Sequence, residues 1–266
     1  MPPESPDYFR STAWDYARFR PGYPPGLFRL LVETFGLSGE GRLLDLGCGT
    51  GQLAIPLAKN FREMVGMVPE PEMLAEAVAA AEGGVKNVRW VQGSSKTLAT
   101  MFPDLGMFRL VSIGRAFHWM KRGEVLDALW GMTTPSGGIA VVSEDLNLWK
   151  ATDGWLVTAR DTLQRWLGEQ RRAGTSSYSA PLERHDAVIA RSNFKKMEVH
   201  AIEYNWRWTM DSFIGFLYST SFCSPAVLGD KREGFENDLR RALLQADPSG
   251  NFAETFQLSV ILARKV

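Results

Sequence analysis

The chain has 266 residues, of which 45% are hydrophobic and 23% are charged, a balance typical of a globular protein that buries a sizeable core. Lys plus Arg and Asp plus Glu both number 30, so the formal net charge is zero. This balance argues against a protein that binds nucleic acid through its phosphates, because such a protein needs a basic surplus or a basic stripe.

The chain shows no sign of secretion or of membrane insertion. Its first residues, MPPESPDYFR, lack the apolar stretch of a signal peptide, and no apolar run approaches the roughly 20 residues of a membrane span. The two cysteines, Cys48 and Cys223, cannot form a disulfide framework, and neither has the spacing of a metal site. We therefore expect a cytoplasmic protein that binds no metal and no membrane.

The first half of the chain alternates between two patterns. An aromatic and basic stretch at 6–20 leads into RPGYPP, whose prolines stop any helix, and residues 26–36 have helical spacing with Gly36 as the stop. Short apolar runs predict strands at 42–46, 63–68, 87–92, 107–113 and 139–144, and helical patterns cover 52–60 and 69–82. Such alternation predicts a parallel sheet with helices on both faces and a ligand at the carboxyl ends of the strands.

Beyond residue 149 the pattern changes to longer helices and two late strands. Helical patterns cover 153–173, 183–192, 210–220 and 229–246, strand-like alternation covers 195–208 and 254–265, and 174–181 is rich in turn residues. The two late strands suit an antiparallel addition to the sheet edge, and the helices suit a cap over the strand ends. Aromatic residues are frequent here; most belong in a core, and the remainder would suit a bulky, partly apolar small molecule.

The segment LLDLGCGTGQLA at 43–54 carries the strongest functional signal. A strand delivers Asp45 into Gly47-x-Gly49-x-Gly51, where the missing side chains let a ligand approach the backbone. The helix that follows directs its positive amino terminus at an anionic group. The alternative is a tight strand-to-helix turn that binds nothing, but an acid at the end of the first strand favours a nucleotide-type site.

With these motifs the chain resembles the class I methyltransferases that use S-adenosylmethionine, in particular small-molecule enzymes of the trans-aconitate and ubiquinone-biosynthesis type. The residues DLGCGTG match the family's first motif, Tyr16, Arg20, Pro21 and Tyr23 match a segment that closes over the cofactor, GRAFHW at 114–119 matches the loop after strand four, and PSGG at 135–138 resembles a turn before strand five. The resemblance implies cofactor contacts at Tyr16, Arg20, Asp45, Gly47, Cys48, Gly49, Gly51, Val68, Ser94, Ser95, Gly114, Arg115 and Ala116.

The resemblance also implies an architecture. We expect a Rossmann-like, mostly parallel seven-stranded sheet with helices on both faces and a helical cap. Residues 1–41 would form an amino-terminal lid and the first helix, residues 42–149 the cofactor-binding core, and residues 150–266 the cap segments with the last two strands. The expected partners are S-adenosylmethionine and a small-molecule acceptor.

Three positions depart from the family pattern. Val68 stands where strand two normally ends in an acid that binds both ribose hydroxyls, and Lys96 and Arg109 stand where acids are usual. Arg109 also fits a structural role instead of a cofactor contact. Two lost charge-assisted hydrogen bonds represent about 3–6 kcal/mol, or two to four decades of affinity. Glu70 and Glu72 are close enough in sequence to compensate, and the alternative is that they only favour the first turn of the helix that follows Pro69. The alternative is a methyltransferase-like enzyme that no longer uses the cofactor and catalyses a cyclisation or pericyclic reaction in natural-product biosynthesis.

His118 is the first candidate for proton transfer, because imidazole titrates near neutrality and the loop after strand four opens toward the substrate. Its structural alternative is a hydrogen bond that orients the His-Trp pair. His185 and His200 fit surface or satisfied positions better. Glu144 and Asp145, at the end of the fifth strand, fit either a base or a solvated strand end.

Overall fold

The computed structural model describes residues 9, 11–174 and 176–266. The chain divides into two compact units. The α/β unit consists of Gly22–Glu144, Ala180–Ile202 and Gln257–Val266, and the second unit consists of the described part of Met1–Pro21 with Asp145–Ser179 and Glu203–Phe256. The three-part division expected from the sequence, at residues 42 and 150, stays a prediction.

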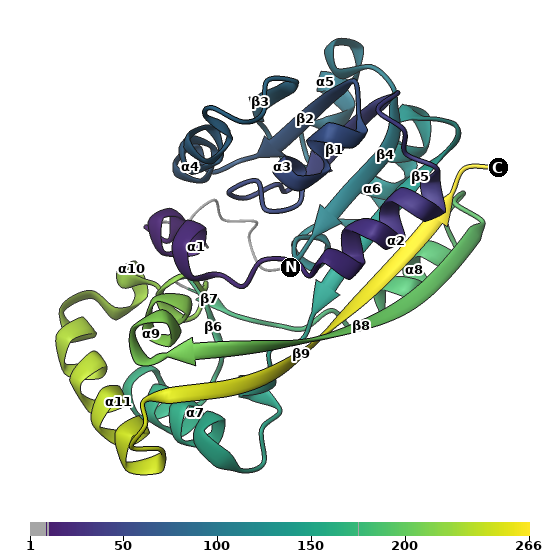
Figure 1. Ribbon diagram of the computed structural model, residues 1–266. Helices are drawn as coiled ribbons and strands as arrows, with labels where there is room; N and C mark the ends of the chain where they lie inside the picture. The colour runs from purple at the N-terminus through teal and green to yellow at the C-terminus, as the bar shows by residue number, and fades with distance from the viewer. Residues whose placement is uncertain (1–8, 10, 175) are drawn as a thin grey trace. The chain divides into compact units, whose positions relative to one another are not determined.

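The described residues form a seven-stranded main sheet in the order β3-β2-β1-β4-β5-β9-β8 (Figure 1). Its strands are β1 (Arg42–Leu46), β2 (Glu63–Val68), β3 (Val88–Gln92), β4 (Phe108–Gly114), β5 (Thr133–Glu144), β8 (Lys196–Thr209) and β9 (Asn251–Arg264). The pairs from β3 to β5 are parallel, and β9 is antiparallel to β5. This order confirms the expected mostly parallel sheet with an antiparallel addition at one edge.

Helices cover both faces of this sheet within the α/β unit (Figure 1). They are α2 (Pro25–Phe35), α3 (Ala54–Leu57), α4 (Pro71–Ala81), α5 (Leu98–Leu105), α6 (Arg122–Met132) and α8 (His185–Ala190), with short 3-10 helices η2 (Ala58–Asn60) and η3 (Phe117–Trp119). The bounds of α2 follow from local chemistry, because Pro25 fits the first helical turn and Gly36 ends the helix in the left-handed conformation, with a φ of 57°.

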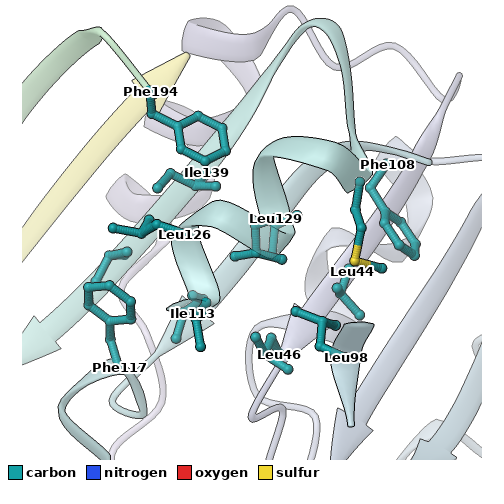
Figure 2. Close-up of a cluster of buried hydrophobic side chains, with 14 of the residues drawn as sticks. Leu44, Leu46, Leu98, Phe108, Ile113, Phe117, Leu126, Leu129, Ile139 and Phe194 are labelled. Atoms are coloured by element: carbon teal, nitrogen blue, oxygen red, sulfur yellow. The ribbon is translucent and has the colours of Figure 1, made fainter. Parts of the chain in front are cut away.

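The core of the α/β unit lies on the face of the sheet that α5, α6 and α8 cover. Figure 2 shows Leu126 and Leu129 of α6 beside Ile113 and Ile139 of the sheet, and all four side chains are almost fully buried. On the opposite face Phe35 of α2 packs against β5. The free energy of burying large apolar side chains, about 1.5–3 kcal/mol each, therefore acts on both faces.

The second unit has its own aromatic core. Its elements are α1 (Ala13–Phe19), η4 (Asn147–Trp149), α7 (Gly154–Leu167), β6 (Arg172–Ala173), β7 (Ser176–Ser177), α9 (Met210–Tyr218), α10 (Pro225–Leu228), η5 (Gly229–Lys231) and α11 (Arg232–Ala246). Trp208 is buried at its centre, and its indole N–H donates to Glu254 Oε2 over 2.7 Å. Asn147 Nδ2 donates to the other oxygen of this carboxylate over 3.0 Å, so the buried acid is satisfied.

Several elements differ from the sequence expectations. The helix expected over 153–173 ends at Leu167, because Gly168 has a φ of 89°, and a short hairpin of β6 and β7 occupies part of the expected turn region. The helix expected over 183–192 belongs to the α/β unit and not to the cap, since Ile189 is buried in the core with Leu126. The helices α5 and α6 are not among the elements expected from the sequence.

The turn expected before strand five is an irregularity inside β5. Thr133 pairs with Phe108 and Gly138 pairs with Leu110, so residues 134–137 bulge out of the sheet. Ser136 has a φ of 61° within this bulge. Among the described residues no helix combines the length and the apolar character that would let it cross a bilayer.

Replacing Gly138 by Ala is expected to lower the free energy of unfolding by about 1–3 kcal/mol, because overpacking forces the surroundings to move. The added Cβ would lie 2.4 Å from the Ala263 carbonyl oxygen and 2.6 Å from the Phe35 ring. The matched control is Gly131→Ala in α6, where a Cβ meets nothing within 4 Å and should be neutral or stabilising. Urea unfolding followed by circular dichroism compares them, and equal losses would contradict this packing.

Candidate functional site

The glycine loop, residues 47–51, connects β1 to the segment that leads into α3. The N–H groups of Gly47 and Cys48 both donate to the Met67 carbonyl, over 2.8 and 3.0 Å, which ties the loop to the end of β2. Gly47, Gly49 and Gly51 have φ values of 77°, 53° and 85°. L side chains rarely adopt this left-handed conformation, so the loop depends on its glycines.

The loop after β4 lies directly against the glycine loop. A Cβ on Gly47 would lie 2.7 Å from the Ala116 Cβ. A Cβ on Gly51 would lie 2.9 Å from Ile55 and 3.0 Å from the Trp90 ring. The structure therefore brings together the two segments that the sequence assigns to one cofactor site, with Trp90 of β3 packed close to Gly51.

Asp45, at the end of β1, is buried. The Ser112 hydroxyl on β4 donates to Asp45 Oδ1 over 2.7 Å, because the register of β1 and β4 places the two residues side by side. Asp45 Oδ2 is also buried and has no hydrogen-bond partner in the described part of the chain. Burial raises the pKa of the carboxyl to about 7, although the Ser112 hydroxyl and the backbone N–H of Ala54 both lower it.

A second polar atom in the same motif has the same property. Thr50 is buried, and its hydroxyl oxygen has no hydrogen-bond partner within the described ranges. A buried polar group without a partner costs about 1–3 kcal/mol. The combination of Asp45 Oδ2 and the Thr50 hydroxyl fits a ligand that brings polar or cationic groups to the glycine loop, as the amino acid part of S-adenosylmethionine does.

The loop after β4 is held by a buried ion pair. Arg115 has a φ of 52°, and its backbone N–H donates to the Val142 carbonyl. Its guanidinium Nη2 lies 3.0 Å from Glu144 Oε2. Both side chains are largely buried, and the guanidinium lies 4.5 Å from the centre of the Tyr23 ring. Glu144 is therefore not a solvated strand end, because it is buried and neutralises the charge of Arg115.

His118 lies in η3 of this loop and is half-buried, with its ring centre 4.7 Å from that of Trp119. The residue before it, Phe117, is buried and meets His185 edge-on. His200 is partly exposed beside a glutamate, and its Nε2 lies 3.3 Å from the carboxylate. Proton transfer by His118 stays a prediction.

At the end of β2 the position of the missing acid is apolar and buried, because Val68 is 4% exposed. Glu70 follows as the residue before the first turn of α4, and burial raises the pKa of its carboxyl. Burial also raises the pKa of the Cys48 thiol well above its usual range, and the charges of Asp45 and Glu70 add to this effect. Glu70 therefore lies within electrostatic reach of the glycine loop, and the thiol is inert.

Ser94 and Ser95, after β3, are half-buried, and Ser94 forms a turn with Thr97. Lys96, in the same turn, is exposed. Arg109 does not belong to the cofactor side. It lies near the amino end of β4, and its guanidinium donates to the Phe35 and Ser136 carbonyls, which fixes the bulge of β5. Of the two roles that the sequence leaves open for Arg109, these hydrogen bonds support the structural one, so Arg109 is not a sign of altered cofactor use.

Tyr16 and Arg20 lie in the second unit, whereas the other expected cofactor contacts and His118 all lie in the α/β unit. The Arg20 guanidinium lies 4.9 Å from the Tyr16 ring centre. Ser112 and Thr50 are not among the site residues expected from the sequence. A small polar residue inside the apolar strand FRLVSIG is the only sequence signal for Ser112.

The comparisons with known proteins agree with this geometry. Residues 43–137 match the model of a family described as a methyltransferase domain. These residues of the α/β unit are therefore similar to a methyltransferase domain, and the unit has the class I methyltransferase fold. An uncharacterized methyltransferase of Mycobacterium tuberculosis is 28% identical over 229 residues, which are 84% of this chain and 81% of that protein. A trans-aconitate 2-methyltransferase of Deinococcus radiodurans is 29% identical, over 53% of this chain and 52% of its own length.

Solved structures share this fold, and the structural similarity extends beyond residues 43–137 to most of this chain. A putative type II methyltransferase from Anaeromyxobacter dehalogenans superposes with a TM-score of 0.60 at 22% identity, covering 93% of this chain and 99% of that one. A methyltransferase from Thiobacillus denitrificans in complex with S-adenosyl-L-homocysteine gives 0.51 at 14% identity, over 98% and 99%. The [4+2]-cyclase SpnF gives 0.52 at 17% identity, over 93% and 83%.

The raised pKa of Asp45 predicts a pH-dependent stability. The native carboxyl holds its proton up to about pH 7, whereas the unfolded chain loses it near the ordinary value of 3.8. The native state then binds more protons between these values, so stability falls as pH rises through this range and levels off above pH 7, with a slope of at most about 1.4 kcal/mol per unit.

Urea unfolding at pH 5, 6, 7 and 8 measures this effect. The free energy of unfolding of the native protein should fall relative to that of Asp45→Asn by about 2–3 kcal/mol between pH 5 and 8. Asp127→Asn, at an exposed position of α6, should follow the native protein. A constant difference between Asp45→Asn and the native protein across the range would contradict a buried, protonated Asp45.

Proposed function

We propose that the protein transfers a methyl group from S-adenosylmethionine to a small-molecule acceptor. The observation that carries this proposal is the buried Asp45 Oδ2, which has no hydrogen-bond partner among the described residues and belongs to the motif of three left-handed glycines. A cationic amine of the cofactor would donate a hydrogen bond to this oxygen and would supply the positive charge that compensates the buried carboxylate. The family match and the fold support the same proposal.

The residues that would hold the cofactor come from the ends of four strands. The Asp45 carboxylate would accept a hydrogen bond from the amino group of the cofactor, and the backbone of the glycine loop, including Cys48, would lie against the cofactor. Glu70 would bind the ribose hydroxyls in place of the acid that Val68 replaces. The remaining contacts would come from Ser94, Ser95, Gly114, Arg115 and Ala116. The cofactor supplies a methyl group activated on a sulfonium. This chain's part is to orient it, and binding of a cation would lower the pKa of Asp45 and keep the carboxylate charged.

The acceptor's chemistry also draws on the loop after β4. We assign His118 the role of accepting a proton from the acceptor, at either ring nitrogen, where the acceptor needs deprotonation. The buried Arg115–Glu144 pair fixes the backbone next to this histidine. The balanced charge favours a small molecule over nucleic acid, and two buried unpaired cysteines favour a reducing compartment such as the cytoplasm.

A second candidate function rests on Val68. A buried apolar side chain at the end of β2 cannot accept hydrogen bonds from a ribose, and the same fold occurs in a [4+2]-cyclase. In this alternative the protein would catalyse a cyclisation or pericyclic reaction without the cofactor. The two candidates differ in one measurable property, which is affinity for S-adenosylmethionine or its product.

Gly49→Val is expected to weaken binding of S-adenosylhomocysteine at least 100-fold, because the side chain enters the loop at a φ of 53° and occupies the ligand's approach to the backbone. Gly83→Val is the matched control. It places the same side chain at a φ of 79° in a position with nothing within 4 Å. Isothermal titration calorimetry compares the two, and unchanged affinity in Gly49→Val would contradict the proposed cradle.

Glu70→Gln is expected to weaken binding of S-adenosylhomocysteine about tenfold, since it removes a charge-assisted hydrogen bond to the ribose. Glu72→Gln, in the exposed first turn of α4, is the matched control and should bind as the native protein does. The dissociation constants come from the same calorimetric titration. Equal affinity in the two variants would show that another group holds the ribose.

A further inference from the structure

The second unit contains a guanidinium surrounded by aromatic rings. The Arg171 guanidinium carbon lies 4.1 Å from the ring centre of Tyr178, 5.3 Å from that of Phe222 and 5.5 Å from that of Trp149. Arg171 Nε and Trp149 Nε1 are both buried, and neither has a hydrogen-bond partner in the described part of the chain. Two N–H donors are thus shielded from water beside the same rings.

A second guanidinium adds positive charge at this place. Burial lowers the pKa of Arg171, the phenol of Tyr178 opposes this effect, and the positive charge of Arg20 lowers the pKa further. Arg20 itself lies 5.3 Å from the centre of the Phe216 ring. The charge of Asp145 also raises the pKa of Arg171, but its side chain is 77% exposed and forms an ion pair with Lys150. The Asp145 carboxylate is therefore already paired with Lys150.

The backbone around Arg171 is fixed before any ligand arrives. Arg171 precedes the hairpin of β6 and β7, and the Tyr178 N–H donates to the Arg171 carbonyl over 2.8 Å. The hairpin is anchored by the Gly174 N–H, which donates to the Ser221 carbonyl over 2.8 Å. A preorganised guanidinium loses little conformational entropy when it binds, and its planar donors match the two oxygens of a carboxylate.

We propose that Arg171, together with Trp149 and the charge of Arg20, binds the carboxylate of a small organic acid. The aromatic rings around the guanidinium favour an organic acid over a free inorganic anion, because they offer contact to an apolar body next to the charge. The binding itself does not depend on the function proposed above.

The test uses benzoate, its uncharged analogue benzamide and inorganic phosphate as probes, each titrated into the full chain by calorimetry. Benzoate should bind, benzamide should bind at least tenfold more weakly, and phosphate should not compete with benzoate at equal concentration. Binding of phosphate in preference to benzoate would overturn the organic acid in favour of a free inorganic anion. The proposed site is wrong if benzoate does not bind at concentrations up to about 10 mM, which is on the order of the weakest dissociation constants worth measuring.

Variants then locate the binding. Arg171→Met keeps the apolar stem and should weaken benzoate binding at least tenfold, whereas Arg172→Met, at the neighbouring position of β6, should leave it within twofold. Trp149→Phe removes only the indole N–H donor and should weaken binding about threefold, which keeps the test decisive if Arg171→Met does not fold. Equal benzoate affinity in Arg171→Met and the native protein would contradict the proposal. Affinity for S-adenosylhomocysteine, measured in the same proteins, separates failure of this site from failure of the proposed function.

Discussion

The attachment of the glycine loop to the end of β2 is the constraint on which the rest of the candidate site depends. Two N–H groups, from Gly47 and Cys48, share the Met67 carbonyl as acceptor. This arrangement turns the chain sharply after β1 and is compatible only with residues that tolerate left-handed backbone. It also brings the loop so close to Ala116 that no side chain fits at position 47. The arrangement of the loops at these strand ends thus depends on the turn after β1.

Electrostatics around this turn divides the acids into two groups. Glu144 is buried but paired with Arg115, so its charge is neutralised within the chain. Asp45 is buried and accepts a hydrogen bond from the Ser112 hydroxyl, and its pKa rises because burial disfavours the charged carboxylate. A protein that keeps such a carboxyl has a stability cost at neutral pH, which a cationic ligand would offset. This contrast is the physical reason for assigning a ligand to Asp45 and a positioning role to Glu144.

The sequence predicts the parts of the structure that depend on local pattern. The bounds of β1 and β2 agree with the expected strands because their buried apolar runs are short and end in glycine or proline. The helix α6 is absent from the expectations. It contains two glycines, and the residue before it, Lys121, forms no side-chain cap hydrogen bond. Its existence depends on tertiary burial of its apolar face, as Figure 2 shows for Leu126 and Leu129.

The candidate site shows the same division. The glycines and Asp45 are visible as a motif, whereas the pairing of Asp45 with Ser112 requires the register between two strands 67 residues apart in sequence. Arg109 illustrates the opposite case, because a motif position that suggests altered ligand binding is explained by hydrogen bonds to Phe35 and to the bulge of β5. Only tertiary structure distinguishes a residue that faces a ligand from one that stabilises a turn.

The central claim is that the glycine loop and Asp45 bind S-adenosylmethionine, and calorimetric titration of the purified protein with this compound tests it most directly. Mass spectrometry first establishes that no nucleoside co-purifies. The account predicts binding in the micromolar range, about −8 kcal/mol, with release of protons near pH 7 as Asp45 ionises. Absence of binding up to millimolar concentration would contradict it and favour chemistry without the cofactor.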